Sequence, residues 1–313
     1  MVSNENQQNT SDQDIDLGYI FSVLLRRKLL LLGITSFITL LVACLSLFMP
    51  NIYRSTALLV PVEQNDEMGG GGLGGSVSSA AALVGIDLGG LGQGDLTDQA
   101  IEVIESLNFF EEYIYPIINP QDFIAIRSWN YKTGEIKYNK RKFDAKSNSW
   151  TRKVNYPLQN PPSAQEVYKI FKQKNLFVNK DKQTNFVEIS VQHHSPILAR
   201  DLLDSIIDNV NTLFREDEKD RATQSVSYIN DSLYSTDITE VRIALSELLK
   251  RETQKLMLVE VNEEYVLKVL QPAYLPERKS RPNRVSITII GLILGFILSS
   301  GYVLFTERRN DRL

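Results

Sequence analysis

The sequence predicts an α+β (α/β) domain with a long protruding helical arm, flanked by two transmembrane helices. Residues 29–49 and 285–306 are two apolar runs without a charged residue. At 1.5 Å per helical residue, each run is long enough to cross a hydrocarbon core about 30 Å thick. Between the runs, strand-like and helix-like periodicities follow one another, which indicates a mixed domain over residues 50–284.

Basic residues beside the two runs predict the orientation in the membrane. The clusters are Arg26, Arg27 and Lys28 before the first run, and Arg308, Arg309 and Arg312 after the second. Lys and Arg concentrate on the cytoplasmic side of membrane helices. We therefore expect residues 1–28 and 307–313 to be cytoplasmic tails. In a bacterium, residues 50–284 would then be periplasmic.

The first half of the domain begins with a predicted strand over residues 51–62 (NIYRSTALLVPV), which are partly alternating and rich in β-branched side chains. A Gly-rich segment over residues 69–94 predicts a loop that holds a short Ala-rich helix at 78–84. It lacks the G-x-x-x-x-G-K-[ST] pattern of a phosphate-binding loop. An amphipathic helix is expected over residues 97–113, with Thr97 or Asp98 as its cap.

A polar hairpin around Thr133-Gly134 is predicted within residues 121–152. Its basic and aromatic residues suit either a solvated surface or a glycan-binding surface. A helix over residues 163–172 and a hairpin with strands at 176–179 and 186–192 complete this part of the domain.

The predicted arm, residues 195–262, begins with Ser195 as N-cap and Pro196 in the first helical turn. An apolar stripe predicts that this first helix docks on a sheet: Leu202, Leu203, Ile206, Ile207, Val210, Leu213 and Phe214. Beyond the stripe the helix is mostly charged and is expected to protrude. Asp237 is the expected cap of a second, antiparallel helix. A strand over residues 265–271 then returns the chain toward the second apolar run.

Sparse apolar positions on the two arm helices are candidate contacts between protomers, because an isolated pair of helices buries little surface. The candidates are Val226, Ile229 and Leu245. In the second apolar run, Gly291, Gly295 and Ser299 fall four residues apart, so one helix face admits close approach of another backbone. Our hypothesis is that this helix-packing face contacts a polymerase or a neighbouring protomer.

The composition and the motifs predict no catalytic residue, cofactor or metal site. A net charge of −4 gives no electrostatic footprint for nucleic acid. His193 and His194 are adjacent at a strand end, so their side chains point to opposite faces and cannot both ligate one metal ion. The spaced acids Asp12, Asp14 and Asp16 lie in a short polar tail. The single cysteine, Cys44, permits no disulfide within the chain.

This order of parts resembles the polysaccharide co-polymerase, or chain-length determinant (Wzz-type), family of bacterial inner-membrane proteins. The resemblance is carried by the paired terminal runs and by the segments YRSTALLVPV, FVEISVQHHSP and QPAYLPERKSRPNR. It implies an α/β membrane-proximal domain, a helical arm that projects into the periplasm, and a ring-like homo-oligomer.

The function implied by the resemblance is non-catalytic regulation of surface polysaccharide (O-antigen-like) chain length in lipopolysaccharide biosynthesis. The expected partners are copies of the chain, a polysaccharide polymerase, the lipid-linked polysaccharide and the membrane. Three alternatives remain open at this point. They are an export adaptor for capsule or exopolysaccharide, a two-span periplasmic sensor, and a membrane-anchored glycan-modifying enzyme that works with paired carboxylates.

Overall fold

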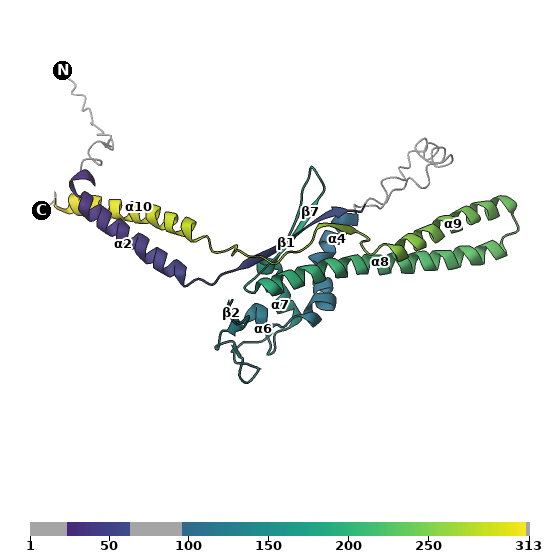
Figure 1. Cartoon of the computed structure of the whole chain (residues 1–313), viewed down its shortest axis with the longest axis horizontal. Coiled ribbons are helices and arrows are strands. Elements are labelled where there is room, and N and C mark those ends of the chain that lie inside the picture. Colours follow the sequence, from purple (N-terminus) through teal and green to yellow (C-terminus); the bar gives the residue numbers. More distant parts are fainter. Residues whose placement is uncertain (1–23, 63–95, 311–313) are drawn as a thin grey trace, which may run out of the picture. The chain divides into compact units, whose positions relative to one another are not determined.

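A computed structural model describes residues 24–62 and 96–310 of the chain. The chain forms two compact units: one comprises residues 1–49 and 282–313, and the other comprises residues 50–281 (Figure 1). The Gly-rich loop at 69–94, its Ala-rich helix at 78–84 and the acidic tail residues Asp12, Asp14 and Asp16 lie outside the described residues.

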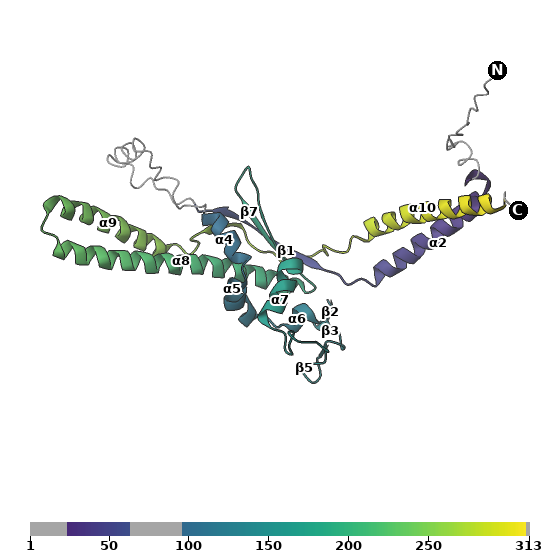
Figure 2. The ribbon, with the colours of Figure 1, turned by 180° about the vertical axis from the view of Figure 1, so that it is seen from behind.

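The first unit is a pair of helices, α2 (Lys28–Leu47) and α10 (Arg284–Asn310), which pack side by side (Figures 1 and 2). Both are long and apolar enough to cross a membrane. Leu31 of α2 and Val303 of α10 are buried between them, and Arg27 forms an ion pair with Glu307 at 2.6 Å. The apolar runs predicted from the sequence are therefore both helical.

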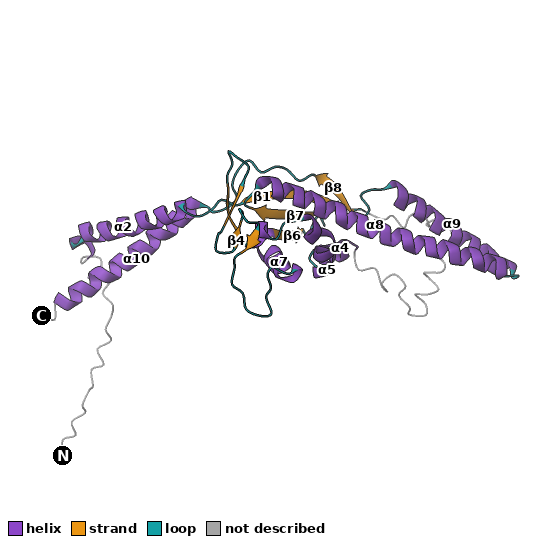
Figure 3. Ribbon diagram, turned by 90° about the horizontal axis from the view of Figure 1, so that it is seen from below, coloured by secondary structure: helices purple, strands orange, loops and turns teal. Residues whose placement is uncertain are grey.

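The second unit is built on a four-stranded antiparallel sheet in the order β6-β7-β1-β8 (Figure 3). The strands are β1 (Tyr53–Pro61), β6 (Leu176–Lys180), β7 (Val187–His193) and β8 (Leu267–Gln271). Tyr53 at the start of β1 pairs with His193 at the end of β7. Sequence periodicity predicted all four strands, and the first and last strands of the domain become neighbours in the sheet.

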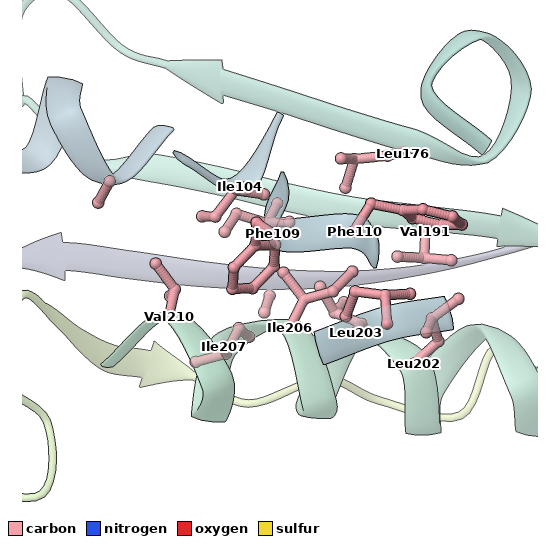
Figure 4. Packing of buried hydrophobic residues seen from close by; sticks show 14 of the residues in the cluster. Ile104, Phe109, Phe110, Leu176, Val191, Leu202, Leu203, Ile206, Ile207 and Val210 are labelled. Carbon is pink, nitrogen blue, oxygen red and sulfur yellow. The ribbon is translucent and has the colours of Figure 1, made fainter. Parts of the chain in front are cut away.

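The core of this unit lies between the sheet and the first part of α8 (Pro196–Ser235) (Figure 4). Ser195 is the N-cap of α8, and its side chain accepts a hydrogen bond from the backbone N–H of Leu198. Five members of the predicted stripe are buried: Leu202, Leu203, Ile206, Ile207 and Val210. Burial of each such side chain contributes about 1.5–3 kcal/mol. The stripe packs on the sheet, which confirms the predicted docking.

Short helices complete the core, and here the structure differs from the predicted single helix at 97–113. The chain instead forms α4 (Leu96–Ile104), α5 (Leu107–Phe109), a π-helical turn (Phe110–Ile114) and a 3-10 turn (Tyr115–Ile117). Ser106 causes the break, because its side chain caps a new helix by accepting a hydrogen bond from Phe109 N at 3.2 Å. The predicted helix at 163–172 is α7 (Ala164–Ile170), followed by a π-helical turn (Phe171–Asn175).

The arm consists of the distal half of α8 and α9 (Thr239–Val261), which run antiparallel as predicted (Figures 1 and 2). Ala222, Ile229 and Val259 are buried in it. Two ion pairs tie the helices together, Lys219 with Glu260 and Lys255 with Glu218. The predicted cap Asp237 was wrong: Ile238 occupies the N-cap position of α9, and no side chain caps this end.

Residues 121–152 form a short helix and a second hairpin in addition to the single hairpin that was predicted. A short helix, α6 (Gln121–Ile124), leads into the hairpin of β2 (Ile126–Trp129) and β3 (Ile136–Tyr138). Gly134 lies in its turn at φ +70°, a conformation that favours glycine. A second small hairpin of β4 (Phe143–Asp144) and β5 (Ser149–Trp150) follows.

Candidate functional site

The small-residue face of α10 packs against α2 of the same chain. A Cβ atom on Gly291 would lie 2.8 Å from Val42 Cγ1, and one on Gly295 would lie 3.2 Å from the Thr35 carbonyl oxygen. Ser299 is fully buried, and its Oγ lies 2.8 Å from Thr35 Oγ1. These contacts leave no room for larger side chains, so the three residues let the two apolar helices approach closely.

Our hypothesis that this face contacts a polymerase or a neighbouring protomer stays a prediction. Within the described residues, the face formed by Gly291, Gly295 and Ser299 is covered by α2. The sequence shows that small residues recur every four positions, but it does not show which helix fills the space beside them. Contacts with another membrane protein would therefore use other faces of the helix pair, which expose Phe37, Leu40 and Ile290.

The candidate protomer contacts on the arm have different environments. Val226 and Leu245 are half-buried. Ile229 is only 4% exposed, because it packs in the arm itself, so little of its side chain is left for a neighbouring protein. A larger exposed apolar set on α9 was not among the candidate contacts predicted from the sequence: Val241, Ile243, Leu248, Met257, Leu258 and Val261. A count of every apolar position on the second arm helix, beyond the expected seam, would have found them.

His193 is a structural residue at the end of the sheet where β1 begins. It is 2% exposed, and its Nδ1 accepts a hydrogen bond from the Ser195 backbone N–H at 3.1 Å. Its Nε2 therefore carries the proton and donates to the Asp122 carbonyl oxygen at 2.9 Å. The neutral ring thus joins β7, the start of α8 and α6.

Neither histidine is placed to ligate a metal ion with its neighbour. The rings of His193 and His194 lie 6.0 Å apart at 85° to each other. Both nitrogens of His193 are already in hydrogen bonds. Among the described residues, no group of three or more His, Cys, Asp or Glu side chains is arranged to hold a metal ion.

The burial of both histidines leads us to expect that the domain loses stability in acid. Burial lowers the pKa of His193, and burial followed by repulsion from His193 lowers the pKa of His194 to about 4. In the unfolded chain each ring protonates near pH 6.5. The folded domain resists protonation of the two rings, so the stability that the neutral rings contribute is complete above about pH 6.5 and falls as the pH drops toward 4.

We expect the urea unfolding midpoint of the full chain to fall over this pH range, and a His194→Gln variant to show a shallower decline. Equal slopes for both proteins would contradict this assignment.

A buried amide, which the sequence analysis did not single out, fastens the base of the arm to β8. Asn211 of α8 is 4% exposed. Its Nδ2 donates to the Leu267 carbonyl oxygen at 2.9 Å, and its Oδ1 accepts from the backbone N–H groups of Val266 and Leu267, both at 3.0 Å. A polar residue four positions after Ile207, inside an apolar stripe, is the signal that would have identified it.

Sequence comparison finds one family that resembles part of the chain. Residues 13–117, about a third of the chain, match the profile of Wzz, described as "Chain length determinant protein". The matched segment covers α2, β1, α4 and the short helices that follow, so it includes parts of both units of the chain. No curated protein matches the chain in sequence.

Two solved structures are similar to the chain. A "full-length bacterial polysaccharide co-polymerase" is 14% identical, covers 95% of this chain and 98% of its own, and superimposes with a TM-score of 0.42. A fragment of WzzB, a polysaccharide co-polymerase from Salmonella Typhimurium, is 11% identical. It covers 74% of this chain and 100% of its own, with a TM-score of 0.29.

The chain has a mixed α+β domain with long helices, and two candidate membrane spans flank that domain. The match over residues 13–117 confirms the resemblance to the chain-length determinant family that was proposed from the sequence.

Proposed function

We propose that this protein is a non-catalytic, oligomeric regulator of the length of a surface polysaccharide, O-antigen-like in kind, in lipopolysaccharide biosynthesis. The observation that carries the proposal is the family match over residues 13–117, on a chain whose α+β domain is tethered at both ends by apolar helices. In this proposal α2 and α10 span the bacterial inner membrane, both tails are cytoplasmic, and residues 50–284 are periplasmic.

The exposed apolar side chains of the arm support assembly with other copies of the chain. Ile243, Met257 and Val261 are each more than half exposed on α9. Apolar side chains clustered on a protruding pair of helices are unfavourable in water and mark a surface for association. A homo-oligomer that covers them would stand beside the membrane, where it meets a polysaccharide polymerase and the lipid-linked polysaccharide. It would bias when extension stops without itself breaking or forming a bond.

Deletion of the gene tests the function directly. Surface polysaccharide from the deletion strain, separated on a gel, is expected to lose its modal length and to show a broad distribution of short and long chains. Expression of the full chain from a plasmid should restore the mode. Complete loss of polymer would favour the export adaptor instead, and an unchanged distribution would favour the two-span sensor.

A further inference from the structure

Residues 121–153, which we call the basic subdomain, carry a charge opposite to that of the rest of the chain. They contain nine Lys and Arg against three Asp and Glu, a net charge of +6, whereas the whole chain has a net charge of −4. Eight of the cations are exposed: Arg127, Lys132, Lys137, Lys140, Arg141, Lys142, Lys146 and Lys153. The salt bridges between described residues include none of these eight.

Packing fixes the basic subdomain to the end of the sheet where β1 begins. The Trp129 ring meets the Tyr53 ring edge to face at 5.7 Å. The Asp122 carbonyl oxygen bonds to His193, which pairs with Tyr53 in the sheet. The cations of the subdomain are therefore held beside the first residues of the sheet.

The same end of the sheet is covalently close to both membrane helices. Tyr53 follows Leu47, the last residue of α2, by six positions. Arg281, which bridges to Ile52, precedes the first residue of α10 by three positions. At about 3.3–3.6 Å per residue, these links cannot span more than roughly 20 Å. The basic subdomain is thus confined to the neighbourhood of the membrane in which α2 and α10 are proposed to lie.

The β2–β3 hairpin separates an inner apolar face from an outer polar face. Trp129 pairs with Ile136, and both are partly buried. Lys137, the next residue, is exposed and lies across from Ser128, as expected from the alternation of side chains along a strand. At the tip, the Tyr131 side chain is 73% exposed beside Lys132, whose Nζ lies 5.8 Å from the Tyr131 ring centroid.

The tryptophans do not present the stacking platforms that a glycan surface needs. The indole N–H of Trp129 donates to the Gly134 carbonyl oxygen, and its ring packs on Tyr53. Trp150 lies 5.2 Å from the Phe143 ring, and the Arg152 guanidinium stacks over it at 5.3 Å. What remains exposed is a cationic surface with tyrosine, a composition typical of contacts with lipid headgroups.

We propose that the basic subdomain binds the anionic headgroups of the membrane from which the domain emerges. This inference rests on the proposed function, because it requires α2 and α10 to span that membrane. Juxtamembrane cations are attracted to anionic lipid, and the attraction acts within about one screening length of the surface. Such a contact would fix the tilt of the sheet, and thereby the direction of the arm, relative to the bilayer.

The two tryptophans of the chain, Trp129 and Trp150, make the test direct because both lie in the basic subdomain. The full chain is reconstituted in nanodiscs of phosphatidylcholine, or of phosphatidylcholine with about one third phosphatidylglycerol. A trace of lipid with a spin label on its headgroup then quenches nearby tryptophan fluorescence. We expect markedly stronger quenching with phosphatidylglycerol. The difference should vanish when salt is raised from about 0.1 M to about 1 M, which shortens the screening length from about 10 Å to about 3 Å.

Matched charge reversals complete the experiment. Lys140→Glu with Arg141→Glu lowers the net charge of the subdomain from +6 to +2 and is expected to remove about half of the phosphatidylglycerol-dependent quenching. Lys250→Glu with Arg251→Glu, an exposed pair on α9, should leave the phosphatidylglycerol-dependent quenching unchanged. The swap Lys140→Arg with Arg141→Lys keeps the charge and should keep the quenching.

The outcomes separate this proposal from the proposed function. Incorporation into both kinds of nanodisc with equal quenching would overturn the headgroup contact while leaving the membrane topology intact. Failure of the chain to incorporate at all would overturn both.

Discussion

Replacing Gly291 with leucine will force α10 away from α2, whereas replacing Gly301 with leucine will leave the two helices paired. A Cβ at position 291 would meet Val42 Cγ1 at 2.8 Å and Val42 Cβ at 2.9 Å, both shorter than real contacts. At Gly301, in the same helix, nothing lies within 4 Å of a Cβ. Overpacking of a close interface costs about 1–3 kcal/mol, which corresponds to at least about a fivefold loss of the paired state.

A designed disulfide measures this pairing. Thr35 Oγ1 and Ser299 Oγ lie 2.8 Å apart, so Thr35→Cys with Ser299→Cys in a Cys44→Ser background should crosslink on oxidation. After proteolysis between the two helices, a crosslinked chain keeps its ends together on a non-reducing gel. We expect efficient crosslinking with Gly301→Leu and a severalfold lower yield with Gly291→Leu. Equal yields would show that the glycine face does not set the helix spacing.

We expect the packing of α10 against α2 to influence the length of the polysaccharide. A Cβ on Gly295 would lie 3.2 Å from a backbone atom, the Thr35 carbonyl oxygen, which cannot move as a side chain does. Gly295→Leu is therefore expected to shift the length distribution of the polysaccharide at normal expression, with Gly301→Leu as the matched control. An unchanged distribution would separate helix packing from length control.

Periodicity was sufficient to predict the sheet and the base of the arm. The stripe that includes Leu203 and Ile206 has a helical period, and β7 is enriched in β-branched residues, so burial on one face dictates both kinds of element. The sequence does not show in the same way where a side chain ends one helix and starts another. The pattern at 97–113 continues past Ser106, and only the structure shows that its hydroxyl starts a new helix. Likewise, Asp237 is a good capping residue, but the chain begins α9 one residue later.

The sequence alone does not show which residues contact each other when they lie far apart along the chain. The spacing of Gly291, Gly295 and Ser299 predicted a close helix contact, but the identity of the opposing helix depends on the fold of the whole chain. The hairpin around Gly134 was predicted, whereas its attachment to Tyr53 through Trp129 joins residues far apart in the sequence. One sequence by itself carries no record of which distant residues come into contact.

Asn211→Ala is expected to lower the free energy of unfolding of the domain by about 3 kcal/mol, because three buried hydrogen bonds are lost at about 1 kcal/mol or more each. The amide pairs with the backbone of Val266 and Leu267 where β8 begins, and both residues are buried. No backbone rearrangement in a packed core replaces these partners cheaply. The start of β8 should therefore fray, and the strand that returns the chain toward α10 should lose its fixed register on β1.

Asn209, two residues earlier in α8, provides the matched control. It is the same residue type in the same helix, half-buried rather than buried. We expect Asn209→Ala to change the urea unfolding midpoint of the detergent-solubilised chain little, and Asn211→Ala to lower it strongly. Amide hydrogen exchange at Val266 and Leu267 should accelerate only in the second variant. If both variants unfolded at the same midpoint, β8 would owe its position to its pairing with β1 alone, and the arm would be anchored by its apolar stripe without help from this amide.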